Sequence, residues 1–180
     1  MPTPLTQPQF DVLHALVRAG DALTQRQIHE ATGMSPESVN AAVRELEARG
    51  YVVDRRIADA GLEALEPYRV SNAIIMAAGL SERFAPISYE RPKGTLRVRG
   101  EILIERQIRQ LHEAGIADIT VVVGYKKEYF FYLAEQFGVT IVINDEYLVR
   151  NNNGSLWRVR KRLGNTYICS SDDYFTSNPL

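Results

Sequence analysis

Two cations follow a short apolar run and a turn of small residues near the middle of the chain. The run at 73–76 has the length and composition of a strand buried on both faces of a parallel sheet. The turn that ends it removes side-chain bulk, so that backbone N–H groups can approach an anion; its residues are Ala77, Ala78 and Gly79. Arg83 offers a forked donor and Lys93 a point charge, and both could converge on a polyphosphate. The stretch is typical of a loop that binds a polyphosphate.

A turn of this kind also occurs in α/β proteins where it serves packing alone, and that alternative stays open. Two known phosphate loops are excluded. The sequence contains no G-x-x-x-x-G-K-[ST], and the tripeptide Gly79-Leu80-Ser81 lacks the second glycine of the dinucleotide fingerprint.

The order of residues in the loop resembles the signature of nucleotidyltransferases that couple an NTP to a phosphorylated small molecule. That signature reads roughly L-A-A-G-x-G-[ST]-R-x-x-P-x-[ST]…P-K-x-L, and the positions in register are Met76, Ala77, Ala78, Gly79, Arg83, Pro86, Ser88, Pro92 and Lys93. The resemblance implies that Ala77, Ala78 and Gly79 bind a nucleotide and that Arg83 and Lys93 are catalytic. Three positions depart from the signature. Ser81 replaces the second glycine, Glu82 replaces the small hydroxyl residue, and Gly94 directly follows the lysine.

The sequence after the loop alternates between helix and strand patterns, which is typical of a parallel sheet in a three-layer α/β/α domain. We predict helices at 102–114 and 128–137 and strands at 119–123 and 140–143. In the helix at 128–137, Phe131, Leu133 and Phe137 are predicted to face the core. Ligands gather at the carboxyl ends of strands in such sheets, so the site is expected there.

A polar string at 151–156 precedes a helix predicted at 155–162. Its asparagines could serve capping and turn formation alone. Together with the segment at 124–130 and an N-D-x-Y step, however, the string makes residues 72–175 resemble the phosphocholine cytidylyltransferase branch of the family. The matching loop is implied to lie beside the base and ribose, which makes Asn152 and Ser155 nucleotide-binding candidates.

Two aspartates follow the apolar strand that is predicted before Ser170. A carboxylate at a strand end beside a phosphate loop suits Mg²⁺, because this hard cation takes oxygen ligands and phosphates supply the remainder. In the family a D-x-D occupies this place; here Ser170 stands at its first position, and Asp172 at the second is implied to hold the metal. Asp173 could assist Asp172 or be merely solvated, and a chance surface pair also stays open.

Residues 1–68 read as a separate winged helix-turn-helix domain, and 69–180 as the N-terminal portion of the transferase domain. Helices are predicted at about 7–19, between Thr24 and Gly33, and from Pro36 to Gly50, because Thr24 with Gln27 forms a capping box and Ser35 caps a helix that starts with Pro36. Phe10, Leu13 and Val17 are predicted to face the core from the first helix, and Ile28 and Ala31 from the second. A two-stranded wing at 51–57 and a short helix at 59–65 follow.

This arrangement resembles the small winged domains of bacterial regulators. DNA contacts are predicted from Asn40, Arg44, Arg55 and Arg56. Residues 1–70 carry seven Arg and ten Asp plus Glu, however, and phosphate neutralisation dominates DNA affinity. We therefore expect weak DNA binding if any, and a docking or regulatory role stays open.

Length and composition bound the remaining possibilities. The 180 residues are 45% hydrophobic with a formal net charge of -1, which is typical of a globular chain without general polyanion affinity. The sequence has no apolar run of membrane-spanning length, and its start does not read as a signal peptide, so a cytoplasmic protein is expected. Cys169 is the only cysteine, which excludes an internal disulfide and favours a small core residue.

The leading hypothesis is a Mg²⁺-dependent cytidylyltransferase that joins CTP, or another NTP, to phosphocholine or a similar phosphorylated small molecule and releases pyrophosphate. The rival is a winged-helix transcriptional regulator that senses nucleotide through a degenerate transferase domain. The family's domain is implied to continue beyond the position of Leu180 with a second metal carboxylate and much of the acceptor pocket. Very low turnover is therefore expected of residues 1–180, and a homo-oligomer stays open.

Overall fold

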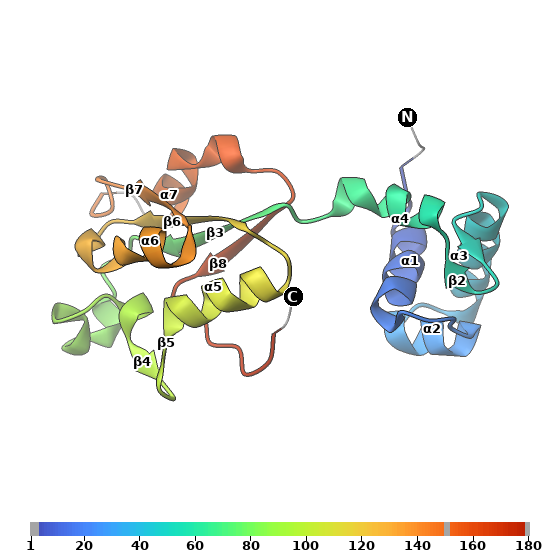
Figure 1. Cartoon of the computed structure of the whole chain (residues 1–180), viewed down its shortest axis with the longest axis horizontal. Helices are drawn as coiled ribbons and strands as arrows, with labels where there is room; N and C mark the ends of the chain where they lie inside the picture. The colour runs from blue at the N-terminus through green and yellow to red at the C-terminus, as the bar shows by residue number, and fades with distance from the viewer. Residues whose placement is uncertain (1–3, 150–151, 179–180) are drawn as a thin grey trace. The chain divides into compact units, whose positions relative to one another are not determined.

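The chain divides into two compact units in the computed structural model, which describes residues 4–149 and 152–178 (Figure 1). The N-terminal unit is Met1–Arg69 and the C-terminal unit is Val70–Leu180. The N-terminal unit contains three helices, a two-stranded antiparallel wing and a last short helix. Their bounds are α1 Gln7–Ala19, α2 Gln25–Thr32, α3 Pro36–Ala48, β1 Val52–Val53, β2 Arg56–Ile57 and α4 Asp59–Leu65.

Local capping signals set the starts of the helices in the N-terminal unit. Thr24 Oγ1 accepts a hydrogen bond from the backbone N–H of Gln27 at 3.3 Å, and Gln27 Oε1 accepts one from the N–H of Thr24 at 2.9 Å. Ser35 Oγ accepts from the N–H of Ser38 at 3.2 Å at the start of α3. These bonds satisfy N–H groups that have no partner within the helix. The predicted helix at 7–19 is confirmed, as are the helix between Thr24 and Gly33 and the helix that starts at Pro36.

The core of the N-terminal unit lies between α1, α2, α3 and the first wing strand. Its buried residues are Val12, Leu13, Leu16, Ile28, Val39, Ala42, Val43, Leu46 and Val52. Two predicted core positions are wrong. Val17 is 42% exposed, because the buried face of α1 runs through Leu13 and Leu16, and Ala31 is exposed on α2.

A parallel four-stranded sheet forms the centre of the C-terminal unit, in the order β7-β6-β3-β8. The strands are β3 Asn72–Ala77, β6 Asp118–Val123, β7 Thr140–Ile143 and β8 Thr166–Ser170. A small antiparallel pair, β4 Arg97–Val98 and β5 Glu101–Ile102, precedes α5 Leu103–Glu113. The remaining helices are α6 Tyr132–Phe137 and α7 Asn152–Arg158. The predicted α/β class with a mostly parallel sheet is confirmed.

Side chains alternate between the two faces of this sheet, so each face has its own apolar cluster. One face, which includes Ile75 and Val121, packs against α5 and α6 through Ile104, Ile108 and Leu133. On the other face, a smaller cluster joins Ile74 and Val122 to Val159, which follows α7. Helical segments thus cover both faces and make three layers (Figure 1).

Two helix predictions in the C-terminal unit need correction. The segment predicted as one helix at 128–137 starts with a 3₁₀ turn, Lys127–Phe130, before α6. The turn rotates Phe130 into the core at 0% exposure and leaves Phe131 45% exposed, so the predicted inward position of Phe131 is wrong. The helix predicted at 155–162 begins earlier, as α7, and ends in a 3₁₀ turn, Arg160–Arg162.

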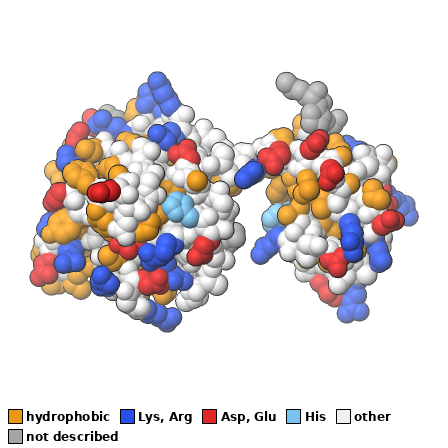
Figure 2. Space-filling model, in the orientation of Figure 1, with side chains coloured by type: hydrophobic (Ala, Val, Ile, Leu, Met, Phe, Trp, Pro, Cys, Tyr) orange, Lys and Arg blue, Asp and Glu red, His pale blue; other side chains and the backbone are white. Residues whose placement is uncertain are grey.

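Charged and hydrophobic side chains are interspersed on the visible surface of each unit (Figure 2). This mixture agrees with the formal net charge of -1. Within the described residues, the structure contains no helix whose length and hydropathy suit a bilayer-spanning segment.

Candidate active site

Three strand ends meet at one edge of the sheet. The parallel register pairs Ala77 of β3 with Val123 of β6, and Met76 of β3 with Ser170 of β8. The residues that follow these strands therefore leave the sheet side by side. The segments are 78–93, which we call the nucleotide loop, 124–126, and 171–173. They include most of the predicted site residues.

The start of the nucleotide loop is tightly placed on the sheet. Ala77 and Ala78 are buried, Gly79 is exposed, and the carbonyl of Ala78 accepts a hydrogen bond from the N–H of Tyr125 at 3.2 Å. Ser81, which stands at the second glycine of the signature, has φ of 59°. This left-handed conformation favours glycine, so the backbone at Ser81 would suit the glycine of the signature although the residue differs.

Lys93 and Asp172 meet at the end of β8. Lys93 Nζ lies 2.7 Å from Asp172 Oδ1 and 3.5 Å from Ser170 Oγ, and the Ser170 hydroxyl also donates to Asp172 Oδ1. Gly94 makes this approach possible, because a Cβ there would lie 2.8 Å from Cβ of Ser171. Gly94, which departs from the signature, thus allows Lys93 to lie against the end of β8.

The Lys93–Asp172 pair is partly buried, with side chains 21% and 23% exposed. Burial raises the pKa of Asp172, but the hydrogen bonds from Lys93 and Ser170 outweigh burial and leave this pKa below its ordinary value. The carboxylate is therefore ionised at neutral pH, and its charge is compensated by a lysine that can also face a phosphate.

Asn152 and Ser155 occupy different environments at the start of α7. Asn152 is exposed, whereas Ser155 is 3% exposed and its Oγ accepts a hydrogen bond from Asn144 Nδ2 at 3.1 Å. Asn144 directly follows β7, so this bond ties α7 to the same edge of the sheet. The nucleotide contact predicted for Asn152 and Ser155 stays a prediction.

Arg83 lies in a 3₁₀ turn, Glu82–Phe84, within the nucleotide loop. Its side chain, like Asn151 of the polar string, falls outside what the structure describes. The catalytic role predicted for Arg83 stays a prediction.

Residues 73–169, more than half of the 180, match the model of the MobA-like NTP transferase domain. The chain belongs to this family. The loop, the parallel sheet and the Lys93–Asp172 pair all lie in or directly after the matched segment. Residues 3–61 match the MarR family, so the N-terminal unit is MarR-like.

Two curated relatives within the NTP transferases are cytidylyltransferases. The choline-phosphate cytidylyltransferase of Streptococcus pneumoniae is 46% identical over 106 residues, which are 59% of this chain and 46% of that protein. The 2-aminoethylphosphonate cytidylyltransferase of Lancefieldella rimae is 47% identical over 105 residues, which are 57% of this chain and 43% of that protein. The chain thus spans about half the length of these relatives.

A solved NTP transferase structure shares the fold of the C-terminal unit. The CTP:phosphocholine cytidylyltransferase of Streptococcus pneumoniae superposes with a TM-score of 0.60 at 44% identity. The superposition covers 62% of this chain and 49% of that chain. The predicted nucleotidyltransferase fold is therefore confirmed.

The oxygen atoms at the end of β8 could supply some of the ligands of a hard divalent cation. Asp172 supplies an ionised, partly exposed carboxylate beside the hydroxyl of Ser170, and Mg²⁺ takes oxygen ligands of this kind. Asp173 differs from Asp172, because its Oδ2 accepts the backbone N–H of Ser170 at 3.1 Å and so shapes the turn. Among the described residues no three His, Cys, Asp or Glu side chains gather as a ligand set. The structure therefore fits one protein carboxylate completed by phosphate oxygens and water.

Four aromatic side chains of the C-terminal unit, Tyr125, Tyr147, Trp157 and Tyr174, do not gather at one place. Tyr125 and Tyr147 have ring centroids 6.4 Å apart near the end of β6. Trp157 instead stacks with Arg160, whose Cζ is 4.2 Å from the ring centroid, and Tyr174 faces Arg106 at 5.0 Å. The structure thus distributes these rings among three places.

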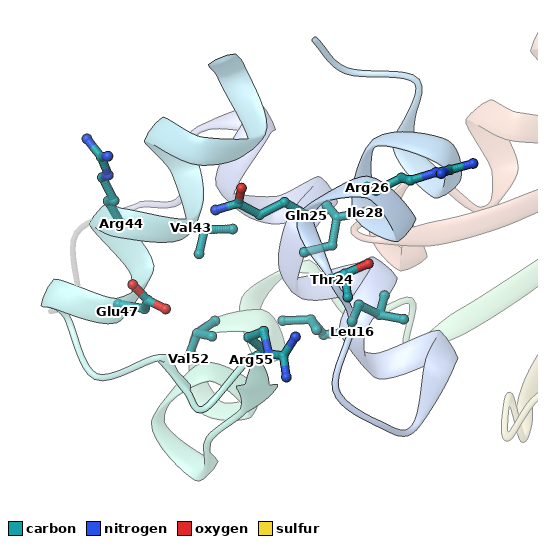
Figure 3. Close-up of a pocket in the computed structure, with 11 residues that line it drawn as sticks. Leu16, Thr24, Gln25, Arg26, Ile28, Val43, Arg44, Glu47, Val52 and Arg55 are labelled. Carbon is teal, nitrogen blue, oxygen red and sulfur yellow. The ribbon is translucent and has the colours of Figure 1, made fainter. Parts of the chain in front are cut away.

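The N-terminal unit has a groove of about 570 Å³, lined by apolar and charged side chains (Figure 3). Its floor is apolar, with Leu16, Val43 and Val52, and Arg44 and Arg55 line it from α3 and the wing. Arg56, a predicted DNA contact, instead pairs with Asp21 at 2.6 Å.

The sequence analysis missed two side chains that bind backbone carbonyls at this edge of the sheet. Gln107 on α5 donates from Nε2 to the carbonyls of Ser170 and Asp173 at 2.7 and 2.9 Å, on either side of Asp172. Lys126 donates from Nζ to carbonyls of the nucleotide loop. The helical period of α5 marks Gln107 only as a polar residue between Ile104 and Ile108, and no local pattern marks Lys126.

Proposed function

We propose that the chain carries the nucleotide-binding half of a cytidylyltransferase that acts on phosphocholine or a similar small phosphorylated molecule. One observation carries this proposal: Lys93 of the signature loop lies 2.7 Å from Asp172 at the adjoining strand end. A cation and a carboxylate at the same edge can receive a triphosphate and its metal together. The 46% identity to a choline-phosphate cytidylyltransferase supports the choice of CTP and of the acceptor class.

The reaction needs little covalent help from the protein. An oxygen of the acceptor's phosphate, already anionic near neutral pH, forms a bond to the α-phosphorus of CTP, while the bond from that phosphorus to the bridging oxygen breaks and pyrophosphate leaves. Lys93 would bind the triphosphate oxygens, and the small residues from Ala77 to Gly79 would let backbone N–H groups approach them. Mg²⁺, when bound through Asp172 and the phosphates, would neutralise charge that develops on the leaving group.

Binding of CTP tests this assignment directly. Lys93→Ala should weaken CTP binding by roughly 1.5–3 kcal/mol, because one charge-assisted contact is lost. Isothermal calorimetry measures the change, with Lys127→Ala as the control, since Lys127 pairs with Asp145 at 3.6 Å outside the strand-end pair. Equal CTP affinities for Lys93→Ala and the unmodified protein would refute the role of the loop.

The dependence of Mg²⁺ binding on CTP tests the role of Asp172. Mg²⁺ should bind weakly to the free protein and more tightly with CTP, because phosphate oxygens must complete its octahedron. Asp172→Asn should remove this linkage, while Asp145→Asn, an exposed aspartate, should keep it. Pyrophosphate release from each of the four NTPs with phosphocholine then reports base preference. Undiminished release after Asp172→Asn would place the metal elsewhere.

A second candidate is a regulator that senses nucleotide, and the MarR-family match at residues 3–61 favours it. Arg44 and Arg55 are exposed beside the groove and could meet DNA phosphates, but Glu47 lines the same groove. DNA binding should therefore be weak and should fall at least about tenfold between 50 and 200 mM salt. Fluorescence anisotropy with a labelled duplex measures this fall, and tight binding that hardly changes with salt would contradict it.

A further inference from the structure

Tyr125 and Lys126 contact the nucleotide loop at both of its ends. The N–H of Tyr125 donates to the carbonyl of Ala78 at the start of the loop. Farther along the loop, Tyr125 Oη donates to the carbonyl of Ser88 at 3.3 Å. Lys126 Nζ donates to the carbonyls of Tyr89 at 2.7 Å and Glu90 at 3.1 Å. One dipeptide after β6 thus binds four carbonyls of the loop.

The loop has little apolar packing of its own to fix its shape. Three of its four large hydrophobic side chains, Phe84, Ile87 and Tyr89, are 39%, 56% and 69% exposed, and the fourth, Leu80, is half-buried. Ser88 is buried, at 1% exposure, and it lies among the bound carbonyls. A segment with few buried apolar contacts opens easily unless polar contacts restrain it. The hydrogen bonds from Tyr125 and Lys126 therefore carry much of the restraint.

The backbone around Lys126 is shaped for this contact. Lys126 has φ of 49°, a left-handed conformation that non-glycine residues seldom adopt. Gly124 packs so closely that a Cβ there would lie 2.8 Å from both the carbonyl oxygen of Ala78 and Cβ of Tyr147. The ammonium of Lys126 also lies 5.8 Å from the ring centroids of Tyr125 and Tyr129, within the range of a cation–π contact.

We propose that Lys126 is a positioning residue for the nucleotide loop, a role that rests on the proposed function of that loop. Its ammonium holds Tyr89 and Glu90, and Glu90 lies three residues before Lys93. Fixing this segment places Lys93 at the end of β8, where it meets Asp172. Lys126 thus acts on the triphosphate through Lys93 and touches no reacting atom.

The order of the loop can be measured without nucleotide. Lys126→Met keeps most of the side-chain length but removes the ammonium group that makes both hydrogen bonds to the loop. Amide hydrogen exchange in residues 82–92 should therefore become at least about threefold faster. Lys127→Met is the matched control, because it removes the same charge from the next residue, which pairs with Asp145 instead. The control should exchange like the unmodified protein, and circular dichroism should show that both variants are folded.

Nucleotide affinity supplies the second measurement. Lys126→Met should weaken CTP binding about 5- to 20-fold, the scale of a lost hydrogen bond from a charged donor. Lys126→Arg retains donors for the two carbonyls and should recover most of this loss. Tyr125→Phe removes only the bond to Ser88 and should loosen the loop less than Lys126→Met does. This variant also serves if Lys126→Met does not fold.

The two measurements separate this role from the function of the site. If the unmodified protein does not bind CTP, the proposed function fails, and the exchange of residues 82–92 alone decides the role of Lys126. Exchange in Lys126→Met and Tyr125→Phe that matches the unmodified protein would overturn the role. If Lys127→Met speeds amide exchange in residues 82–92 as much as Lys126→Met does, the proposed role of Lys126 is also overturned, because the loss of a positive charge alone would then explain the effect.

Discussion

The hydrogen bonds that start helices in the N-terminal unit and those at the strand ends of the C-terminal unit span very different distances along the chain. In the N-terminal unit, the bonds that start α2 and α3 join residues three positions apart, such as Thr24 with Gln27. In the C-terminal unit, the bonds at the strand ends join remote segments: Gln107 reaches Ser170, 63 positions away, and Lys126 reaches Tyr89, 37 positions away. The first kind of contact makes a helix begin, whereas the second holds two segments in fixed relation.

This difference indicates what each unit needs from its polar side chains. An apolar core holds the N-terminal unit, and its surface charges pair both locally, as Arg26 does with Glu30, and over longer separations, as Arg56 does with Asp21. The sheet of the C-terminal unit also has apolar cores, but its nucleotide loop and the turn after β8 lie beyond them. Side chains that bind backbone carbonyls replace packing at this edge, as is common in loops that carry binding sites.

The largest expected effect is in the core of the N-terminal unit. Leu13 is 0% exposed on α1, so Leu13→Ala should destabilise this unit by about 2–5 kcal/mol through lost burial and the cavity that remains. Val17→Ala on the same helix is the control and should stay within about 0.5 kcal/mol, because Val17 is 42% exposed. Urea unfolding measures both changes. Equal losses for the two variants would mean that the buried face of α1 is wrongly assigned.

A smaller effect is expected at Gln107, which is 4% exposed beside the turn that carries Asp172. Gln107→Leu removes two donors and should destabilise the C-terminal unit by about 1–3 kcal/mol. Within the described residues Gln107 Oε1 has no hydrogen-bond partner, so the loss should lie toward the low end. Thermal unfolding gives the change, with exposed Gln136→Leu as control.

A second substitution at Gln107 sharpens this prediction. Gln107→Glu places a carboxylate against the carbonyls of Ser170 and Asp173, so an acceptor would face acceptors. It should destabilise the C-terminal unit more than Gln107→Leu does. If Gln107→Leu destabilised the unit more than Gln107→Glu, Gln107 would contribute to stability by filling space in the core and not by binding the carbonyls of the turn.

The contrast between local and remote contacts also explains what the sequence could predict. The capping box at Thr24, proline at the start of α3 and the apolar period of α5 are local signals, and they placed those helices correctly. The parallel sheet followed from the alternation of strand and helix. Phe131 was misplaced because a 3₁₀ turn changes the helical phase by a fraction of a turn, which periodicity does not register.

The strand-end contacts could be predicted only in part. Lys93 and Asp172 were predicted as site residues because a family signature and strand ends point to the same edge, and the structure brings the two side chains together there. Nothing local indicates that Lys126 binds two carbonyls, since its neighbour Lys127 has the same side chain and a different partner. Gly94 looked like a departure from the signature until the structure placed it against Ser171. The positions of these residues depend on contacts with segments that are distant in the sequence.

The smallest effect at neutral pH concerns Cys169, which lies on β8 between the apolar cluster under α5 and the polar strand end. Burial, with a smaller contribution from the charge of Asp173, raises the pKa of the Cys169 thiol to about 12. The unfolded chain should ionise this thiol near pH 8.5. Between these values the unfolded state releases a proton that the folded state keeps, so rising pH favours unfolding.

The stabilisation from Cys169 should therefore be complete below about pH 8.5 and should fall by about 1 kcal/mol by pH 9.5. Cys169→Ala has no thiol to ionise, so subtracting its free energy of unfolding at each pH removes the contributions of tyrosine and lysine. Denaturant unfolding from pH 7 to 10 measures this difference. A difference that stays constant over that range, together with rapid reaction of the folded thiol with a disulfide reagent at pH 8, would mean that Cys169 is accessible and that the strand end opens to solvent beneath Asp172.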